Sequence, residues 1–313
     1  METIRRAVID VGTNSIKILV AEVTGREVRP LLEESKQTRL GKDFYQTHRL
    51  QSSAIAASAE AVAQFAAIAR EQKAATIRVI ATSAARDAVN SAELTDAIEK
   101  ASRLEVEVIS GEQEANWVFQ GATSDKSLAD SPILLLDVGG GSSEFIFGRG
   151  PQKKFSQSLP LGSVRLMERF PVQDPPGPDQ LSICRKWLRE FLNNELAGNL
   201  RPVMQSEAGE KVQLVGTGGT TSILGRMEAR LEEYDRARIE ATRIGIDRIR
   251  GHVNHLWSLP LEERKQIPGL PKSRADVILF GSAIYESVME FFGFEELRIS
   301  TRGLRFAVVM EGI

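Results

Sequence analysis

Apolar side chains recur along this chain at two spacings, one typical of strands and the other typical of helices. Residues 4–35 hold three strand-like runs separated by turn residues, and they predict a β-meander. Residues 51–73 are rich in alanine and carry apolar side chains at helical spacing, which predicts a helix that serines near its start would cap. A β-branched strand over 76–82 and a helix over 83–102 follow. The N-terminal part therefore reads as a meander followed by alternating helices and strands.

A further strand and helix complete this first pattern, and the same order then begins again. Residues 104–110 predict a further strand, and Ser110 with Gln113 gives the pattern of a capping box at the start of the next helix. An apolar hairpin over 133–148 then restarts the meander. Residues 171–180 hold four of the twelve prolines, so they predict an irregular loop between helices.

The C-terminal part is predicted to be mostly helical. Residues 211–219 read as a strand that runs into a loop, and a charged, helix-rich region extends to about residue 265. Residues 274–292 predict a long helix with an apolar face, before a final strand, turn and helix.

Two stretches of the chain have nearly the same pattern. Residues 8–20 read VIDVGTNSIKILV and residues 135–147 read LLDVGGGSSEFIF, each with an Asp at the end of an apolar run and a turn of small residues after it. Such turns let backbone N–H groups converge on phosphate oxygens, and the carboxylates of Asp10 and Asp137 could hold a hydrated divalent cation beside them. The alternative is that both are ordinary hairpins whose glycines serve only turn geometry.

A third glycine-rich segment strengthens the phosphate hypothesis. Residues 215–222 read VGTGGTTS and follow an apolar strand-like run. Two matching hairpins and a third loop of this kind predict two related lobes that close on a chain of phosphates.

Composition limits the class of protein. The chain has 313 residues, of which 42% are hydrophobic and 26% charged, and this length fits two domains better than one. A net charge of −2 gives no sign of DNA or RNA binding. The apolar runs are too short for a membrane span, and the predicted first strand leaves no room for a signal peptide. The single cysteine, Cys184, fits a reducing cytoplasm and lies in an amphipathic helical pattern that favours a structural role.

With these motifs in place, the chain resembles the exopolyphosphatase/guanosine pentaphosphate phosphohydrolase (Ppx/GppA) family. The matching segments are AVIDVGTNSIKILV, TRLGKDF, ATSAARDA, ISGEQEA, LLLDVGGGSSEF, LPLGSVRLMERF, LVGTGGTTS, RADVILFGSAI and ISTRGLR. The resemblance implies an α/β fold with two ribonuclease H-like lobes of the actin, sugar kinase and heat-shock chaperone superfamily, and a cleft between the lobes. Residues 1–124 would form the first lobe, completed by 302–313, and residues 125–301 the second. The C-terminal helical domain of longer members is expected to be missing.

The resemblance also implies the site residues. The ISGEQEA segment places the catalytic glutamate at Glu114, which would orient or deprotonate the attacking water. Mg²⁺ or Mn²⁺ would be held by three acidic residues, Asp10, Asp137 and Glu144. The substrate phosphates would be bound by Thr13, Asn14, Ser15, Arg86, Gly139, Gly140, Gly141, Ser142, Gly216, Thr217, Gly218 and Gly219. For Arg86 the alternative is an ion pair with Asp87 or Glu114 that only shapes the loop.

The sequence departs from the family pattern at a few positions. Gln113 stands where a second acid usually precedes Glu114, although the acid next to alanine is kept. In the last segment the chain has Thr301, Phe306 and Ala307, where two acids and a glycine are common. The family pattern therefore does not define the ligand contacts or the packing of this last turn.

The predicted activity is metal-dependent hydrolysis of the terminal phosphate of inorganic polyphosphate by a cytoplasmic enzyme that binds no membrane and forms a homodimer. Guanosine pentaphosphate is the alternative substrate within the family. An ATP-binding kinase or a non-catalytic nucleotide sensor of the same superfamily is the alternative from another class. His252 and His255 have the spacing of metal ligands, but no third ligand type clusters near them in the sequence, so a zinc site is not expected.

Overall fold

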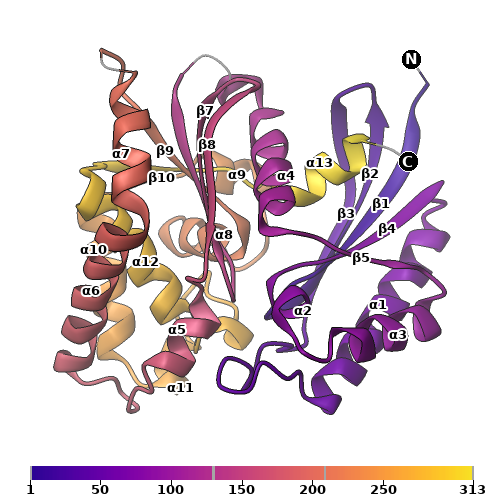
Figure 1. Ribbon diagram of the computed structural model, residues 1–313, viewed down its shortest axis with the longest axis horizontal. Coiled ribbons are helices and arrows are strands. Elements are labelled where there is room, and N and C mark those ends of the chain that lie inside the picture. The colour runs from indigo at the N-terminus through magenta and orange to yellow at the C-terminus, as the bar shows by residue number, and fades with distance from the viewer. Residues whose placement is uncertain (1, 129–130, 208, 312–313) are drawn as a thin grey trace. The chain divides into compact units, whose positions relative to one another are not determined.

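The structure is a computed structural model, and it describes residues 2–128, 131–207 and 209–311. The chain divides into two compact units (Figure 1). Unit 1 combines Met1–Ser124 with the C-terminal segment Arg302–Ile313, and unit 2 is Asp125–Thr301. Each unit is built around one mixed β-sheet, which confirms the predicted α/β fold with two lobes.

The sheet of unit 1 has the strand order β3-β2-β1-β4-β5. β1 pairs antiparallel with β2 and parallel with β4, as expected when a meander is followed by a crossover helix. This is the arrangement of a ribonuclease H-like lobe. The strands are β1 (Ile4–Val11), β2 (Ser15–Thr24), β3 (Glu27–Gln37), β4 (Thr76–Ala81) and β5 (Val106–Val108).

Helices cover both faces of this sheet (Figure 1). One face carries Ala7, Ile9 and Val11, which form a core with α1 and α3. The alternate residues of β1 point to the other face, where α13 packs against β1, β2 and α4. The helices are α1 (Ser52–Glu71), α2 (Ser83–Asp87), α3 (Ser91–Ser102), α4 (Gly111–Thr123) and α13 (Leu304–Glu311).

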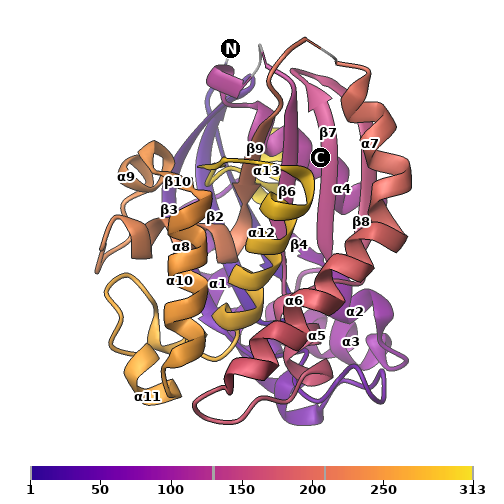
Figure 2. The ribbon, with the colours of Figure 1, turned by 90° about the vertical axis from the view of Figure 1, so that its left-hand side faces the viewer.

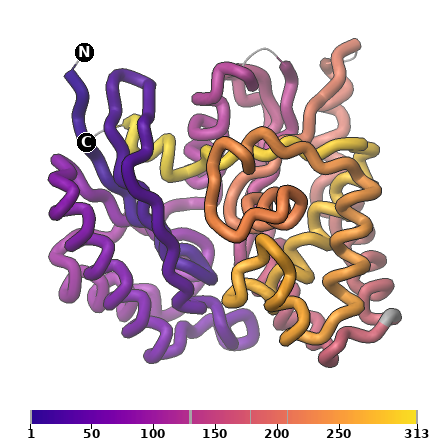
Figure 3. Tube along the Cα trace, turned by 180° about the vertical axis from the view of Figure 1, so that it is seen from behind, coloured from indigo at the N-terminus to yellow at the C-terminus, as the bar shows by residue number. Residues whose placement is uncertain are grey.

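The C-terminal segment is an integral part of unit 1. Its yellow trace lies beside the indigo strands in Figure 3. A Cβ added at Gly121 of α4 would overlap the Gly303 carbonyl, so the two backbones approach as closely as glycine permits. The Arg6 guanidinium of β1 donates to the Val309 carbonyl at 2.9 Å, which ties the end of α13 to the sheet.

One described helix, α1, is long and apolar enough to cross a membrane by length and composition alone. Half of its apolar window is buried inside the structure, and its buried residues contribute to the core of unit 1. A core helix of a soluble protein passes the same test, so α1 gives only weak support for a membrane span.

The sheet of unit 2 repeats the arrangement of unit 1. Its order is β10-β11-β9-β6-β7-β8, so the five strands from β8 to β11 follow the order of unit 1, and β10 is added at the edge. β6 pairs antiparallel with β7 and parallel with β9. The strands are β6 (Ile133–Val138), β7 (Ser143–Arg149), β8 (Gln152–Leu159), β9 (Gln213–Thr217), β10 (Arg243–Gly245) and β11 (Glu296–Ile299).

Most of the helical mass of unit 2 packs on one face of its sheet. Figure 2 shows α6, α10 and α12 in front of the strands, and Leu134, Leu136 and Val138 of β6 belong to the core that these helices complete. The helical segments are η1 (Lys126–Leu128), α5 (Ser163–Arg169), α6 (Pro178–Leu192), η2 (Asn193–Ala197), α7 (Gly198–Gln205), α8 (Gly218–Glu228), α9 (Arg236–Ala241), α10 (Ile246–Ser258), α11 (Leu261–Arg264), η3 (Lys272–Arg274) and α12 (Ile278–Phe292).

Some predicted boundaries were wrong. The helix expected over 83–102 is two helices, because the buried Asn90 exchanges hydrogen bonds with the backbone of Leu50 and interrupts it. α1 begins at Ser52 with Gln51 as its N-cap and no side-chain cap, so the expected serine cap is absent there. The strand expected over 104–110 is shortened to β5.

The three residues that depart from the family pattern near the C-terminus each contact or pack against the rest of the fold. The Thr301 hydroxyl donates to Glu240 Oε1 at 2.5 Å. Phe306 and Ala307 are 1% and 0% exposed in α13, and the Arg302 guanidinium lies 5.6 Å from the centre of the Phe306 ring. These three residues therefore have structural roles within their own units.

Candidate active site

The turn between β1 and β2, residues 12–15, is called here the unit 1 turn. The Gly12 N–H donates to the Ser15 carbonyl at 3.2 Å, which leaves Thr13 and Asn14 at the tip. The Thr13 carbonyl accepts a hydrogen bond of 2.7 Å from the Gly41 N–H, which belongs to a segment behind the turn. In a trans peptide the carbonyl and the following N–H point in opposite directions. Holding the Thr13 carbonyl from behind therefore directs the Asn14 N–H outward.

The unit 2 turn, residues 139–142, joins β6 to β7 and has the same closure. The Gly139 N–H donates to the Ser142 carbonyl at 3.0 Å, and Gly140 and Gly141 form the tip. Residues 163–165 hold the turn carbonyls from behind. Within the described part of the chain, the N–H groups of Gly140 and Gly141 donate no hydrogen bond. The repeat seen in the sequence is thus a repeat of backbone geometry.

Each turn follows an aspartate at the same register. Asp10 pairs across the hairpin with Lys17, and Asp137 pairs with Glu144. Directly opposite residues share one face of a sheet, so Asp137 and Glu144 are neighbours. Glu144 is only 2% exposed and accepts a 2.8 Å hydrogen bond from the Ser158 hydroxyl. Two adjacent carboxylates, of which Glu144 is buried, form a suitable site for a cation.

The segment predicted as a loop over 215–222 is instead a direct strand-to-helix junction. β9 ends at Thr217 and α8 begins at Gly218. Gly218 has a φ of +84°, and a Cβ at this position would overlap the Asp137 carboxylate. The Asp137 carboxylate therefore lies against the first turn of α8, where the helix dipole favours a negative charge.

Two side chains missed by the sequence reasoning fix the backbone on either side of Asp137. The Tyr285 hydroxyl of α12 donates to the Leu136 carbonyl at 2.9 Å, and the Thr220 hydroxyl of α8 donates to the Val138 carbonyl at 3.0 Å. Burial raises the pKa of Tyr285, so its hydroxyl stays protonated as a donor. Both residues hold the end of β6 in place.

The other predicted members of the 215–222 segment differ in accessibility. Gly216 is buried inside β9, where a Cβ would lie 2.8 Å from the Thr221 methyl, so packing alone accounts for this glycine. Thr217 is 1% exposed, whereas Gly219 is partly exposed in the first turn of α8.

Glu114 and Arg86 meet at the carboxyl end of the unit 1 sheet. Ser110 caps α4 by accepting a hydrogen bond from the Gln113 N–H, which places Glu114 in the first turn of the helix. Arg86 Nη1, from α2, lies 3.1 Å from Glu114 Oε2, and Arg86 Nε lies 3.6 Å from Asp87 Oδ1. Both ion pairs considered for Arg86 are therefore present, and its contact with phosphate stays a prediction.

Among the described residues of unit 1, three of the buried polar atoms that have no hydrogen-bond partner lie near this edge of the sheet. They are Asn14 Nδ2, Thr38 Oγ1 and Ser83 Oγ, in side chains no more than 8% exposed. Asn14 is at the tip of the unit 1 turn, Thr38 directly follows β3, and Ser83 begins α2 after β4. Buried polar atoms normally have partners, so this edge of the sheet is suited to a polar ligand. Their position in TRLGKDF and ATSAARDA was the only sequence signal for Thr38 and Ser83.

No group of three or more His, Cys, Asp or Glu side chains with metal-binding geometry occurs among the described residues. The Asp137 and Glu144 pair still fits Mg²⁺, because this ion commonly takes one or two carboxylates and completes its shell with water and substrate phosphates. The residues present are therefore compatible with the predicted cation.

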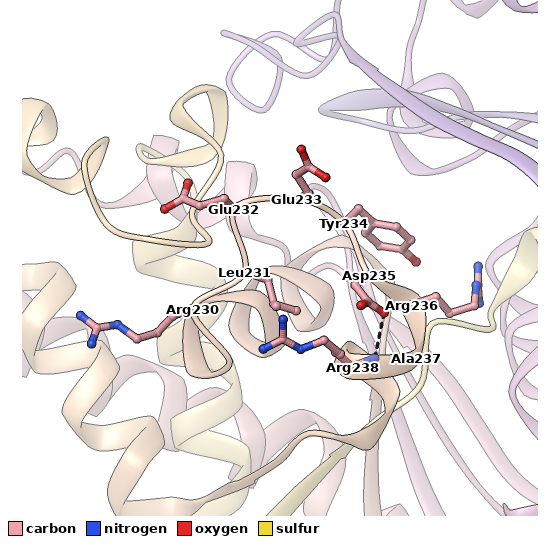
Figure 4. A pocket seen from close by; sticks show the side chains of 9 residues that line it. All are labelled: Arg230, Leu231, Glu232, Glu233, Tyr234, Asp235, Arg236, Ala237 and Arg238. Carbon is pink, nitrogen blue, oxygen red and sulfur yellow. Dashed lines mark hydrogen bonds between the residues drawn. The ribbon is translucent and has the colours of Figure 1, made fainter.

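The pocket of about 570 Å³ shown in Figure 4 lies apart from these motifs, in the loop between α8 and α9. Its lining includes Arg230, Glu232 and Tyr234, and the Asp235 carboxylate accepts from the Arg238 N–H at 3.1 Å. None of the predicted site residues lines it.

Cys184 and His252, two other candidates from the sequence, both lie in surroundings that indicate a structural role. Cys184 is fully buried in the core of unit 2, and burial raises the pKa of its thiol to about 12. His252 Nε2 lies 2.7 Å from Glu228 Oε2, which also contacts Arg248.

Comparison with known proteins gives one consistent result. The family model described as the Ppx/GppA phosphatase family matches residues 19–312. Exopolyphosphatase 2 of Mycobacterium tuberculosis is 31% identical to this chain, and the match covers 96% of each sequence.

Two solved structures are similar to this chain over nearly its whole length. The Aquifex aeolicus PPX-GPPA enzyme superposes with a TM-score of 0.79 and 28% identity, covering 99% of this chain and 100% of that one. An exopolyphosphatase from Cytophaga hutchinsonii superposes with a TM-score of 0.86 and 26% identity, covering 97% of this chain and 96% of that one.

Proposed function

The chain belongs to the Ppx/GppA phosphatase family of phosphoanhydride hydrolases, and we propose that it is an exopolyphosphatase. The proposed reaction removes the terminal phosphate of inorganic polyphosphate in the presence of a divalent cation.

The observation that carries this proposal is the repeated turn. Residues 12–15 and 139–142 close with the same N–H to carbonyl hydrogen bond, and a segment behind each turn holds its tip carbonyls. This arrangement presents backbone N–H groups, which bind phosphate oxygens without reading any other part of a ligand. Donors of this kind in both units suit a substrate made only of phosphates.

The proposed reaction needs one general base. It also needs several cationic or N–H groups that contact the phosphate oxygens. A water oxygen attacks the terminal phosphorus, the bond from that phosphorus to the bridging oxygen breaks, and the Glu114 carboxylate accepts the proton from the water. The products are inorganic phosphate and a chain shorter by one phosphate. A positioned base of this type contributes about 10²–10⁴-fold to the rate.

The remaining residues would bind and orient the substrate. The N–H groups of both turns and the Arg86 guanidinium would hold phosphate oxygens, since a planar guanidinium can engage two oxygens at once. Asp10, Asp137 and Glu144 would hold Mg²⁺ or Mn²⁺, which when bound neutralises negative charge on the phosphate oxygens. A homodimer and a cytoplasmic location remain predictions.

The test is phosphate release from long-chain polyphosphate, guanosine pentaphosphate and ATP in parallel, each with Mg²⁺ and with a chelator. We expect Mg²⁺-dependent release from polyphosphate, with chains that shorten from their ends. Faster release from guanosine pentaphosphate than from polyphosphate would reverse the assignment within the family. Release from ATP alone would contradict it.

A further inference from the structure

The segment behind the unit 2 turn, residues 163–165, donates hydrogen bonds to three consecutive carbonyls of that turn. The Ser163 N–H donates to the Gly139 carbonyl at 3.0 Å, and the N–H groups of the next two residues donate to Gly140. The third carbonyl, that of Gly141, is held by a side chain: Arg165 Nε of α5 donates to it at 2.8 Å. No motif or comparison assigns a role to this arginine.

In unit 1 the corresponding third carbonyl of the turn is held by backbone donors alone. The N–H groups of Thr38 and Arg39 donate to the Asn14 carbonyl at 3.3 and 3.1 Å. Asn14 and Gly141 occupy equivalent positions, the third residue of each turn. The Arg165 side chain therefore takes the place of two backbone donors.

The segments behind the turns are themselves repeated. Each contains a fully buried leucine followed by glycine, Leu40-Gly41 in unit 1 and Leu161-Gly162 in unit 2. A Cβ at Gly41 would overlap the Thr13 side chain, and a Cβ at Gly162 would overlap the Gly140 carbonyl. The internal repeat thus extends beyond the hairpins to the segment that supports each turn.

We propose that Arg165 is a positioning residue for the phosphate-binding turn of unit 2, an inference that rests on the proposed function of that turn. Peptide planarity couples the Gly141 carbonyl to the Ser142 N–H. By holding this carbonyl, Arg165 fixes the direction of the Ser142 N–H, as the backbone contacts fix the N–H groups of Gly140 and Gly141.

The need for such a contact follows from the composition of the turn. Glycine has more backbone freedom to lose than any other residue, and the tip of this turn is Gly140-Gly141. A hydrogen bond from a charged donor restrains the turn more strongly than a hydrogen bond from a neutral donor. Lysine keeps the charge but lacks the planar Nε–H donor of arginine.

The test compares Arg165→Ala and Arg165→Lys with Arg169→Ala as the matched control. Arg169 lies one turn later in α5, and its guanidinium is 4.7 Å from the centre of the Trp187 ring, away from the turn. The first readout is hydrogen exchange of the Gly139, Val164 and Arg165 amides in the absence of substrate, because these amides donate to carbonyls of the same turn. Both Arg165 variants should exchange faster there, and Arg169→Ala should match the wild type.

The second readout is kinetic. Loss of a hydrogen bond to a charged group should raise KM for polyphosphate about tenfold. The change in kcat should be smaller than the change in KM. The midpoint of thermal unfolding should not change. Calorimetric binding of inorganic tripolyphosphate should weaken by a similar factor.

Three results would overturn the proposal. They are wild-type exchange in Arg165→Ala, wild-type behaviour of Arg165→Lys, and the same effects in Arg169→Ala. A failure of the proposed function is distinguishable, because the wild type would then release no phosphate while the exchange contrast between Arg165 and Arg169 variants remained.

Discussion

Arg86 Nη1 lies 3.1 Å from Glu114 Oε2, so the arginine proposed to contact phosphate is ion-paired with the proposed general base. The same nitrogen donates to the Ile109 carbonyl at 3.1 Å. Arg86 therefore connects α2 to the start of α4 and orients the Glu114 carboxylate before any substrate binds. A phosphate ligand would compete with that carboxylate for the guanidinium.

Arg86→Ala is expected to affect both binding and turnover. Loss of a charged hydrogen bond to phosphate should raise KM for polyphosphate about tenfold. Loss of the contact with Glu114 should also lower kcat. The comparison is steady-state kinetics of Arg86→Ala beside Arg49→Ala, whose exposed guanidinium pairs with Glu93 in the same unit. An unchanged KM with a lower kcat would mean that Arg86 only positions Glu114.

Asp137→Asn should weaken the affinity of the enzyme for its metal ion. Removing one carboxylate of the adjacent Asp137 and Glu144 pair is expected to raise the Mg²⁺ concentration for half-maximal rate about tenfold or more. The measurement is a Mg²⁺ titration of activity, with Asp179→Asn on the exposed start of α6 as the control. Activity that persists in the wild type with a chelator would contradict a metal role for Asp137.

Gly218→Ala tests why a glycine begins α8. A φ of +84° and the overlap of a Cβ with the Asp137 carboxylate predict a loss of stability of more than about 1 kcal/mol. The variant should also need more Mg²⁺, because the carboxylate must move. Gly198→Ala in α7 is the control, since no atom lies within 4 Å of its added Cβ and alanine there should stabilise the helix by about 0.5–1 kcal/mol. Equal unfolding free energies in urea for the two variants would refute this account.

Cys184 predicts a pH dependence of stability. Burial raises the pKa of its thiol to about 12, so the folded protein keeps a proton that the unfolded chain loses above its own pKa of about 8.5. The contribution is therefore complete below that pH and falls as the pH rises, by up to about 1.4 kcal/mol per unit. Urea unfolding between pH 8 and pH 10.5 should show a steeper decline for the wild type than for Cys184→Ala. Parallel declines would show that the thiol ionises equally in both states.

The repeated hairpins could be predicted from the sequence because their signal is local. Alternating apolar residues, a terminal Asp and a turn of small residues lie within thirteen positions in each copy. The β-meander predicted at the start of the chain is confirmed by the neighbouring strands β3, β2 and β1. The start of the helix that carries Glu114 was also recognisable, because the Ser110 cap is three residues from Gln113.

The features that were missed depend on contacts between distant parts of the chain. The break at Asn90 depends on Leu50, forty residues earlier. Gly218 was interpreted as part of a loop because its positive φ, which lets β9 turn straight into α8, is not visible in the sequence. Arg165 is an ordinary helical arginine until the position of the Gly141 carbonyl is known. β10 has only three residues and no clear alternation.

The central claim is that Glu114 is the general base of phosphate release. Its most direct test is the initial rate of phosphate release from long-chain polyphosphate with Mg²⁺ for the wild type, Glu114→Gln and Glu112→Gln. Glu112 is the matched control because it is exposed in the same first turn of α4.

The account predicts that Glu114→Gln releases phosphate at least about a hundredfold more slowly. It should still bind tripolyphosphate and unfold at the wild-type temperature, and Glu112→Gln should match the wild type. A folded Glu114→Gln protein that releases phosphate at nearly the wild-type rate would contradict the claim.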